Sequence, residues 1–203
     1  NFSNEKLLEQ AFTTKAYSNE HHEVENNQVL EFIGDKALDL VVINYLMKKY
    51  SNIDNLNNSF FKTPYDEGFF SSIKSEIVNK ESLAKFIDNL HLQDYLIMSN
   101  GEKLNNLNNQ DSNKEDLFEA IIGAIAIDCN WNIEIISNSV NAMINLNSTI
   151  ENIVSKKNYV NLVQEWSQKN YGVLPKYDYE ESDGFICKLF LHNFKGYFKG
   201  WKK

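Results

Sequence analysis

Two pairs of acidic residues have spacings that would place each pair on one face of a helix. Glu31 and Asp35 are four residues apart, and Asp116 and Glu119 are three apart, separations at which helical side chains are neighbours. Both pairs lie within apolar patterns, so partial burial adds to the repulsion between like charges. A divalent cation reverses both costs, and oxygen ligands suit Mg²⁺ or Mn²⁺. Four such carboxylates could hold one or two ions, which can clamp the attacking and leaving oxygens of a phosphodiester.

Spacing alone leaves other interpretations open. Acids at these separations are common on solvated helix faces, and the acid-rich stretch 111–119 is also typical of a helix N-terminus. A helical interaction module without a metal is a further alternative. His21 and His22 lie in a polar stretch, where we expect solvated side chains and not metal ligands. Cys129 is expected to be a buried small hydrophobe.

The elements that must position the acids are predicted from hydrophobic periodicity. Residues 27–49 and 114–129 form long apolar helical patterns, and the second is apolar enough to be a central helix. Polar stretches at 18–27, 50–64 and 99–113 are predicted loops. Further helices are predicted over 2–12, 66–79, 81–90 and 132–154. Residues 1–155 are therefore predicted to form an all-helical domain.

The sequence pattern changes near Lys156. A helix is predicted over 159–170, followed by strands over 176–181, 185–194 and 195–203. Residues 156–203 are thus predicted to form a small α+β domain of αβββ order.

Composition sets limits on the class of protein. The 203 residues, 23.6 kDa, allow one large domain or a medium one with a small one. The net charge of −8 argues at first sight against a nucleic-acid partner. The charge is uneven, however, because residues 158–203 hold seven Lys and five acids, and no Arg occurs anywhere. Two distant cysteines indicate a reducing intracellular compartment, cytoplasmic or nuclear, and no stretch has the length of a membrane span.

Two segments that contain the acids resemble one known family. "NNQVLEFIGDKAL" is similar to the signature motif of the ribonuclease III family, and "EDLFEAIIGAIAIDC" is similar to its second acidic motif. The stretch between them, from "DEGFFSSIKSEIVN" to "LIMSNGE", also resembles the family. The resemblance covers about residues 3–130, with the motifs in the family's order.

The resemblance implies a fold, an activity and a set of site residues. The positions of Glu31, Asp35, Asp116 and Glu119 match the family's four metal-site carboxylates. The family cleaves double-stranded RNA with Mg²⁺, for which Mn²⁺ can substitute, leaving 5′-phosphate and 3′-hydroxyl ends with a short 3′ overhang. Water attacks phosphorus in line, so no side-chain nucleophile is needed. The implied roles are RNA processing or small-RNA production.

The resemblance also implies a homodimer, with one site in each nuclease domain. Phe32 matches an aromatic residue that the family packs into the partner subunit, although an ordinary core Phe is the alternative. Gly34 would allow close helix approach beside the site.

The chain departs from the signature at three positions. Gln28 replaces a Glu, Val29 replaces an Arg, and Lys36 stands where a small residue is usual. We expect Lys36 to be solvated and not to contact phosphate. Because all four metal carboxylates are present, we expect an active enzyme. The alternative is a catalytically inactive family member that binds double-stranded RNA or a ribonucleoprotein.

Residues 159–203 resemble the start of a double-stranded-RNA-binding domain. Gln164 and Glu165 match the first-helix pair that faces the RNA minor groove. A basic cluster that would contact phosphates consists of Lys199, Lys202 and Lys203. The usual Pro and His after the turn Gly are absent, and the second helix is missing at residue 203, so the domain is either cut or degenerate. A small αβββ cap packed on the nuclease domain is the alternative.

Overall fold

The computed structural model describes residues 2–56, 59–181, 185–191 and 194–200. It contains two compact units, Asn1–Ile150 and Glu151–Lys203. The predicted boundary at residue 155 falls inside a helix that runs from one unit into the other, Leu146–Tyr171. None of the described helices combines the length and hydropathy that crossing a membrane requires.

The first unit is built from helices, most of which begin at a side chain that caps the first turn. Thr14, Asp66 and Asn79 each accept a hydrogen bond from a backbone N–H of the helix that follows. The helices are α1 (Glu5–Phe12), α2 (Lys15–Glu20), α3 (Gln28–Tyr50), α4 (Glu67–Ile77), α5 (Lys80–Leu90), α6 (Asn100–Leu104), α7 (Asp111–Asp128), α8 (Ile133–Ile144) and the start of α9 (Leu146–Tyr171). Short 3₁₀ turns lie at Ile53–Asn55, Leu92–Tyr95 and Leu107–Asn109.

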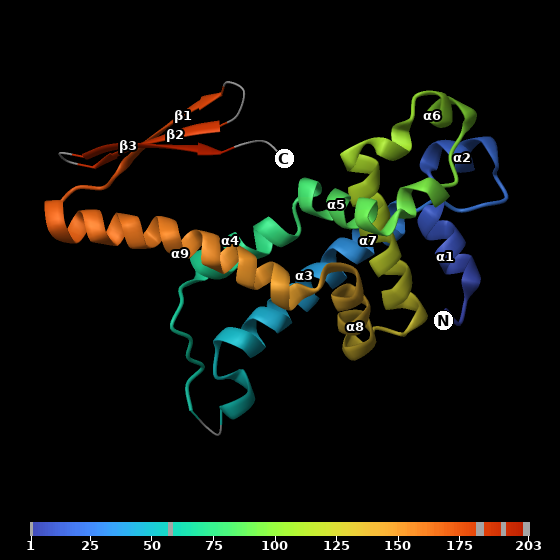
Figure 1. Ribbon diagram of the computed structural model, residues 1–203. Coiled ribbons are helices and arrows are strands. Elements are labelled where there is room, and N and C mark those ends of the chain that lie inside the picture. Colours follow the sequence, from blue (N-terminus) through green and yellow to red (C-terminus); the bar gives the residue numbers. More distant parts are fainter. Residues whose placement is uncertain (1, 57–58, 182–184, 192–193, 201–203) are drawn as a thin grey trace. The chain divides into compact units, whose positions relative to one another are not determined.

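Helices α3 and α7 form the centre of this unit (Figure 1). Helix α7 contacts α1, α3, α5 and α8, and it is buried around most of its circumference, as its apolar sequence predicted. The largest buried side chains of α3 and α7 are Leu30, Leu38, Leu46, Leu117, Phe118 and Ile122. The two helices that carry the acidic pairs therefore also supply much of the hydrophobic core.

Three local features differ from the sequence prediction. The helix expected over 132–154 is broken at Asn145, whose φ of 53° places it in the left-handed region and separates α8 from α9. Two short helices, α2 and α6, lie partly or wholly in stretches predicted as loops. Thr14 caps α2, and Ser99 with Glu102 forms a capping box at α6, so local hydrogen bonds support helices that have no long apolar face.

The second unit contains the remainder of α9 and a three-stranded sheet. Strands β1 (Lys176–Glu181), β2 (Phe185–Leu191) and β3 (Phe194–Gly200) pair antiparallel in the order β1-β2-β3. The register places Asp178 opposite Lys188, and Lys188 opposite Tyr197. At the end of α9, the buried Ser167 hydroxyl donates to the Val173 carbonyl oxygen at 2.6 Å. The predicted fold class, a helical domain followed by a small αβββ unit, is confirmed.

Candidate active site

Helices α3 and α7 meet at two glycines, so their main chains touch. A Cβ atom on Gly34 would lie 1.7 Å from the Glu119 carbonyl oxygen, and one on Gly123 would lie 2.0 Å from the Leu30 carbonyl oxygen. No side chain fits at either position. The expected role of Gly34 is confirmed: it permits close helix approach next to Glu31, Asp35 and Glu119.

The crossing brings the four predicted acids into one electrostatic environment. The pKa of Glu119 is raised to about 8. Burial is the largest cause of this rise, and the Asp35 carboxylate is the second largest. Smaller contributions to the raised pKa of Glu119 come from Glu115, Glu31 and Asp116. Burial also raises the pKa of Glu31, with Asp116 as the strongest neighbouring charge. Each acidic pair therefore acts on the other across the helix interface.

A fifth acid, Glu115, belongs to the same environment and was not among the predicted site residues. It raises the pKa of Glu31, Asp116 and Glu119. Its carboxylate lies 3.6 Å from the Lys80 ammonium of α5, and Lys80 opposes the burial that raises the pKa of Asp116. The signal was present in the sequence, because Glu115 is four residues before Glu119 and shares its helix face.

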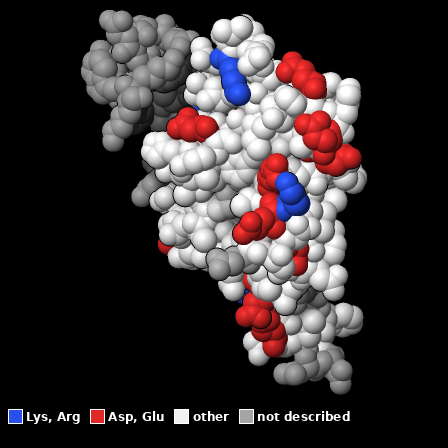
Figure 2. Space-filling view, turned by 90° about the vertical axis from the view of Figure 1, so that its right-hand side faces the viewer, with Lys and Arg blue, Asp and Glu red and all other residues white. Residues whose placement is uncertain are grey.

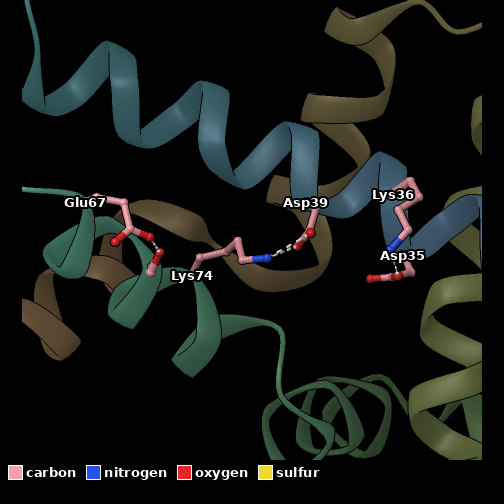
Figure 3. A network of polar contacts seen from close by, with 6 residues as sticks. Asp35, Lys36, Asp39, Glu67 and Lys74 are labelled. Carbon is pink, nitrogen blue, oxygen red and sulfur yellow. Dashed lines mark hydrogen bonds and ion pairs between the residues drawn. The ribbon is translucent and has the colours of Figure 1, made fainter.

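Two lysines contact the acidic face of α3 (Figure 3). The Lys36 side chain is exposed, as expected, but it is also paired: its ammonium lies 2.6 Å from Asp35 Oδ2. One turn further along α3, Asp39 accepts from the Lys74 ammonium of α4 at 2.8 Å. Glu31, Asp35 and Asp39 thus form a stripe at intervals of four residues. Among the described residues, only Asp39 of this stripe pairs with a lysine from another helix.

The oxygen ligands that the four acids offer suit a hard divalent cation, although the side chains do not yet converge on one point. Among the residues that the structure describes, no three His, Cys, Asp or Glu side chains are grouped closely enough to hold an ion as they stand. The four acids nevertheless offer only oxygen ligands, and they repel one another across a partly buried interface. A cation would relieve that repulsion, and rotation of the side chains would have to complete the ligand set.

Acidic side chains are prominent on the surface that Figure 2 shows, with few basic ones between them. A bare surface of this kind repels phosphates, whereas bound cations reverse its sign locally. The negative net charge of the chain is therefore compatible with a phosphodiester substrate only where cations or the lysines intervene.

An exposed apolar stripe runs along α3. Phe32 is 67% exposed and Val29 is 64% exposed, so the interpretation of Phe32 as a core residue is wrong for the single chain. Leu40 and Ile43 are also exposed, and these four residues recur at helical intervals on one side of α3. Lys36 lies between them on the same side of α3 and is itself exposed, so the four residues form two apolar pairs on either side of a lysine. Exposed aromatic and aliphatic side chains grouped on one side of a helix are typical of an interaction face.

Other predicted features turn out differently or cannot be placed. The Cys129 thiol is only partly buried and donates to the Ala126 carbonyl oxygen at 3.6 Å, so the expectation of a buried residue is wrong. His22 is exposed, as expected. His21 is partly buried and stacks on Tyr17, with ring centroids 4.2 Å apart.

The predicted RNA-binding residues lie at the end of the chain that belongs to the second unit. Gln164 is partly buried and Glu165 is exposed on α9. Lys199 lies in β3, but its side chain falls outside the description. Lys202 and Lys203 lie outside the described residues.

Comparison with known proteins places residues 4–140 in a family described as ribonuclease-III-like. The chain is 44% identical to "Ribonuclease 3" from Roseburia hominis, over 86% of this chain and 51% of the relative. It is 43% identical to "Ribonuclease 3" from Treponema succinifaciens, over 73% of this chain and 39% of the relative. The chain thus spans about half of these relatives or less.

Solved structures show the same likeness. The nuclease domain of ribonuclease III from Campylobacter jejuni is 33% identical and has a TM-score of 0.59, with 71% of this chain and 88% of that chain covered. A Dicer structure from Pichia stipitis, 18% identical with a TM-score of 0.50, covers 98% of this chain and 87% of that chain; it shares the fold. The family model covers well over half of the sequence, and the relatives agree with it in name. This chain belongs to the ribonuclease III family.

Proposed function

We propose that the chain is a metal-dependent endoribonuclease that cleaves double-stranded RNA. The observation that carries the proposal is the crossing of α3 and α7, where two glycines allow main-chain contact and where neighbouring acids raise the pKa of Glu31 and of Glu119. A purely structural interface would have no reason to place repelling carboxylates beside its closest contact. Membership of the ribonuclease III family supports the same activity.

In this proposal, Glu31, Asp35, Asp116 and Glu119 hold Mg²⁺, for which Mn²⁺ can substitute. A cation bound there would supply positive charge where a phosphodiester develops negative charge during hydrolysis. Glu119 retains a proton near neutral pH without a cation, because its pKa is about 8, and it must release that proton to become a ligand. Lys36 must likewise yield the Asp35 carboxylate, which it now pairs at 2.6 Å.

The proposed products are ends with a 5′-phosphate and a 3′-hydroxyl and a short 3′ overhang. They would arise in RNA processing or small-RNA production. The named relatives are bacterial, so we propose the cytoplasm as the compartment, and the nuclear alternative has no support.

We further propose that two copies pair through the apolar stripe of α3. The exposed fractions of Phe32 and Val29 support this, since such surface is costly to leave in water. The duplex would gain a second set of contacts from the C-terminal unit, whose sequence from residue 185 onward holds five Lys and no acids. Its proposed RNA-binding residues are Gln164, Glu165, Lys199, Lys202 and Lys203.

The test is cleavage of a long RNA duplex by the whole chain in Mg²⁺ and in Mn²⁺. We expect cutting by the wild type, and we expect Glu119→Gln to bind the duplex but not to cut it. Glu25→Gln serves as the matched control, because Glu25 is an exposed acid outside the acidic cluster. It should cut like the wild type.

Two outcomes would count against the proposal. A duplex that is bound but left intact by wild type in both metals would favour the inactive RNA-binding alternative. Cutting that persists in Glu119→Gln would remove Glu119 from the site. Calorimetry of Mg²⁺ and Mn²⁺ binding with RNA present would distinguish a metal-binding protein, active or inactive, from a helical module that binds no metal.

A further inference from the structure

A small polar pocket of about 120 Å³ adjoins the acidic cluster. Glu31 and Asp116 form the wall that it shares with the proposed active site. The rest of the wall includes Lys15 from α2, Asn27 and Gln28 at the start of α3, and Asn113 from α7. The volume is several times what one water molecule needs, so a polar group of a substrate can enter.

The pocket holds polar side chains whose hydrogen-bonding capacity is unused. Asn27 is only 7% exposed, and its side chain neither caps α3 nor bonds to any other described residue. The polar atoms of its side chain are not fully enclosed and keep some accessible surface. Because the Asn27 amide has no described protein partner and can be reached from the pocket, it is placed to form a hydrogen bond with a ligand there.

Two neighbours of Asn27 are also available. The Gln28 amide and the Lys15 ammonium bond to no side chain or carbonyl in the described part of the chain. Both residues are exposed, so they can meet a ligand at the pocket mouth. The Asn113 amide is partly engaged, since its NH₂ group donates to the Leu107 carbonyl oxygen at 2.7 Å.

The charges of the pocket decide which chemistry it accepts. Lys15 contributes one positive charge, while carboxylates of Glu31, Glu102 and Asp116 also line the space. A phosphate would meet more negative than positive charge there. A neutral hydroxyl group suits the wall better, because it donates to a carboxylate and accepts from an ammonium or amide at the same time.

We propose that this pocket is a ribose subsite, in which the Asn27 and Gln28 amides and the Lys15 ammonium contact the 2′-hydroxyl of a nucleotide next to the scissile phosphate. The 2′-hydroxyl is the group by which a protein distinguishes RNA from DNA at a given position. The subsite would thus determine sugar specificity, and it rests on the proposed function of the adjoining acids. Gln28 gains a role at the position where the family pattern has Glu: an amide can donate to the hydroxyl, and a carboxylate cannot.

The experiment uses the whole chain and a labelled RNA duplex whose cleavage position has been mapped. The two nucleotides that flank the scissile bond are replaced one at a time by 2′-deoxy and 2′-fluoro versions. The fluoro sugar keeps the RNA-like pucker but cannot donate. Cleavage rate in Mg²⁺ and duplex affinity in EDTA are measured for wild type, Lys15→Met, Gln28→Ala and the control Lys6→Met, which removes an exposed lysine of α1 that does not line the pocket.

We expect one flanking position at which either substitution weakens wild type by about tenfold, the ordinary size of one hydrogen bond. The penalty should fall to within about twofold in Lys15→Met and Gln28→Ala and stay in Lys6→Met, because contacting groups are non-additive. A penalty that is the same in all four proteins, or absent at both positions, overturns the subsite. If wild type cuts no RNA at all, no position can be mapped and the nuclease proposal fails. The subsite is then decided by the affinity in EDTA for the RNA duplex and for the same duplex with every sugar 2′-fluoro. A preference for RNA that Lys15→Met and Gln28→Ala lose and Lys6→Met keeps supports the subsite, and a preference that is the same in all four proteins overturns it.

Discussion

Replacing Glu119 by Gln should stabilise the metal-free protein at alkaline pH. The pKa of Glu119 rises from 4.5 to about 8 on folding, first because of burial and then because of Asp35. The folded state therefore binds this proton more tightly than the unfolded state does. Its stabilising effect is complete below about pH 4.5 and is lost as the pH rises to about 8. Gln cannot ionise, so it avoids that loss.

The size of the effect follows from the two pKa values. At about 1.36 kcal/mol per pH unit, the interval from 4.5 to about 8 corresponds to about 5 kcal/mol. Glu119 is only partly buried, so solvent screening reduces this figure, and we take about 2 kcal/mol. For a chain of this length, that difference raises Tm by about 4–8 °C.

The assay is thermal unfolding in EDTA from pH 5 to pH 9, with Glu25→Gln as the matched control. The Tm of Glu119→Gln should lie close to that of wild type at pH 5 and above it at pH 8.5, while the control tracks wild type throughout. Added Mg²⁺ should raise the Tm of wild type and narrow the gap, since the ion proposed for this site would bind only the folded arrangement of carboxylates. A gap that does not change with pH would refute the argument from burial and repulsion.

Three further predictions concern the supports of the site. Gly34→Ala should destabilise the protein by more than about 3 kcal/mol in urea unfolding, because the new Cβ would lie 1.7 Å from a main-chain oxygen. The control Gly101→Ala, where a Cβ would have nothing within 4 Å, should change stability by less than about 1 kcal/mol. Equal losses in the two variants would contradict the close contact of α3 with α7. Phe32→Ala should weaken self-association by about tenfold or more in sedimentation, and an unchanged monomer–dimer balance would remove Phe32 from the interface. Lys74→Met should cost about 1 kcal/mol, less at high salt, because Asp39 loses its partner at 2.8 Å; a loss that salt does not alter would mean that packing, not charge, holds α4 there.

The long helices and the sheet could be predicted because their patterns are strong. Helix α7 shows an apolar run that only a central position explains, and the strands alternate with turn residues, as the structure confirms. The break at Asn145 was missed because an Asn residue inside an apolar pattern gives no sign of its φ of 53°. Helix α6 was missed because its support is the Ser99–Glu102 capping box, which carries no periodicity.

The acids themselves could be proposed from their spacing, but their surroundings could not. Glu115 lies four residues before Glu119, the same separation as between Glu31 and Asp35. Only the fold, however, shows that the Lys80 ammonium lies 3.6 Å from the Glu115 carboxylate. The pairing of Lys36 with Asp35 joins sequence neighbours and depends on rotamers, which the sequence does not specify. The pocket beside Asn27 joins four separate segments, so no local pattern could reveal it.

The glycine crossing has a consequence for which acids the site can use. Because main-chain atoms of α3 and α7 are in contact at Gly34 and Gly123, the helices cannot slide to compensate for a shorter or longer side chain. Of the four predicted acids, each helix contributes one Glu and one Asp, and these two side chains differ in reach by one methylene group. An exchange of Glu119 for Asp would keep the charge but withdraw the oxygens by about 1.5 Å, the length of one carbon–carbon bond. For the proposed cation site, the length of each acidic side chain therefore matters as well as its charge.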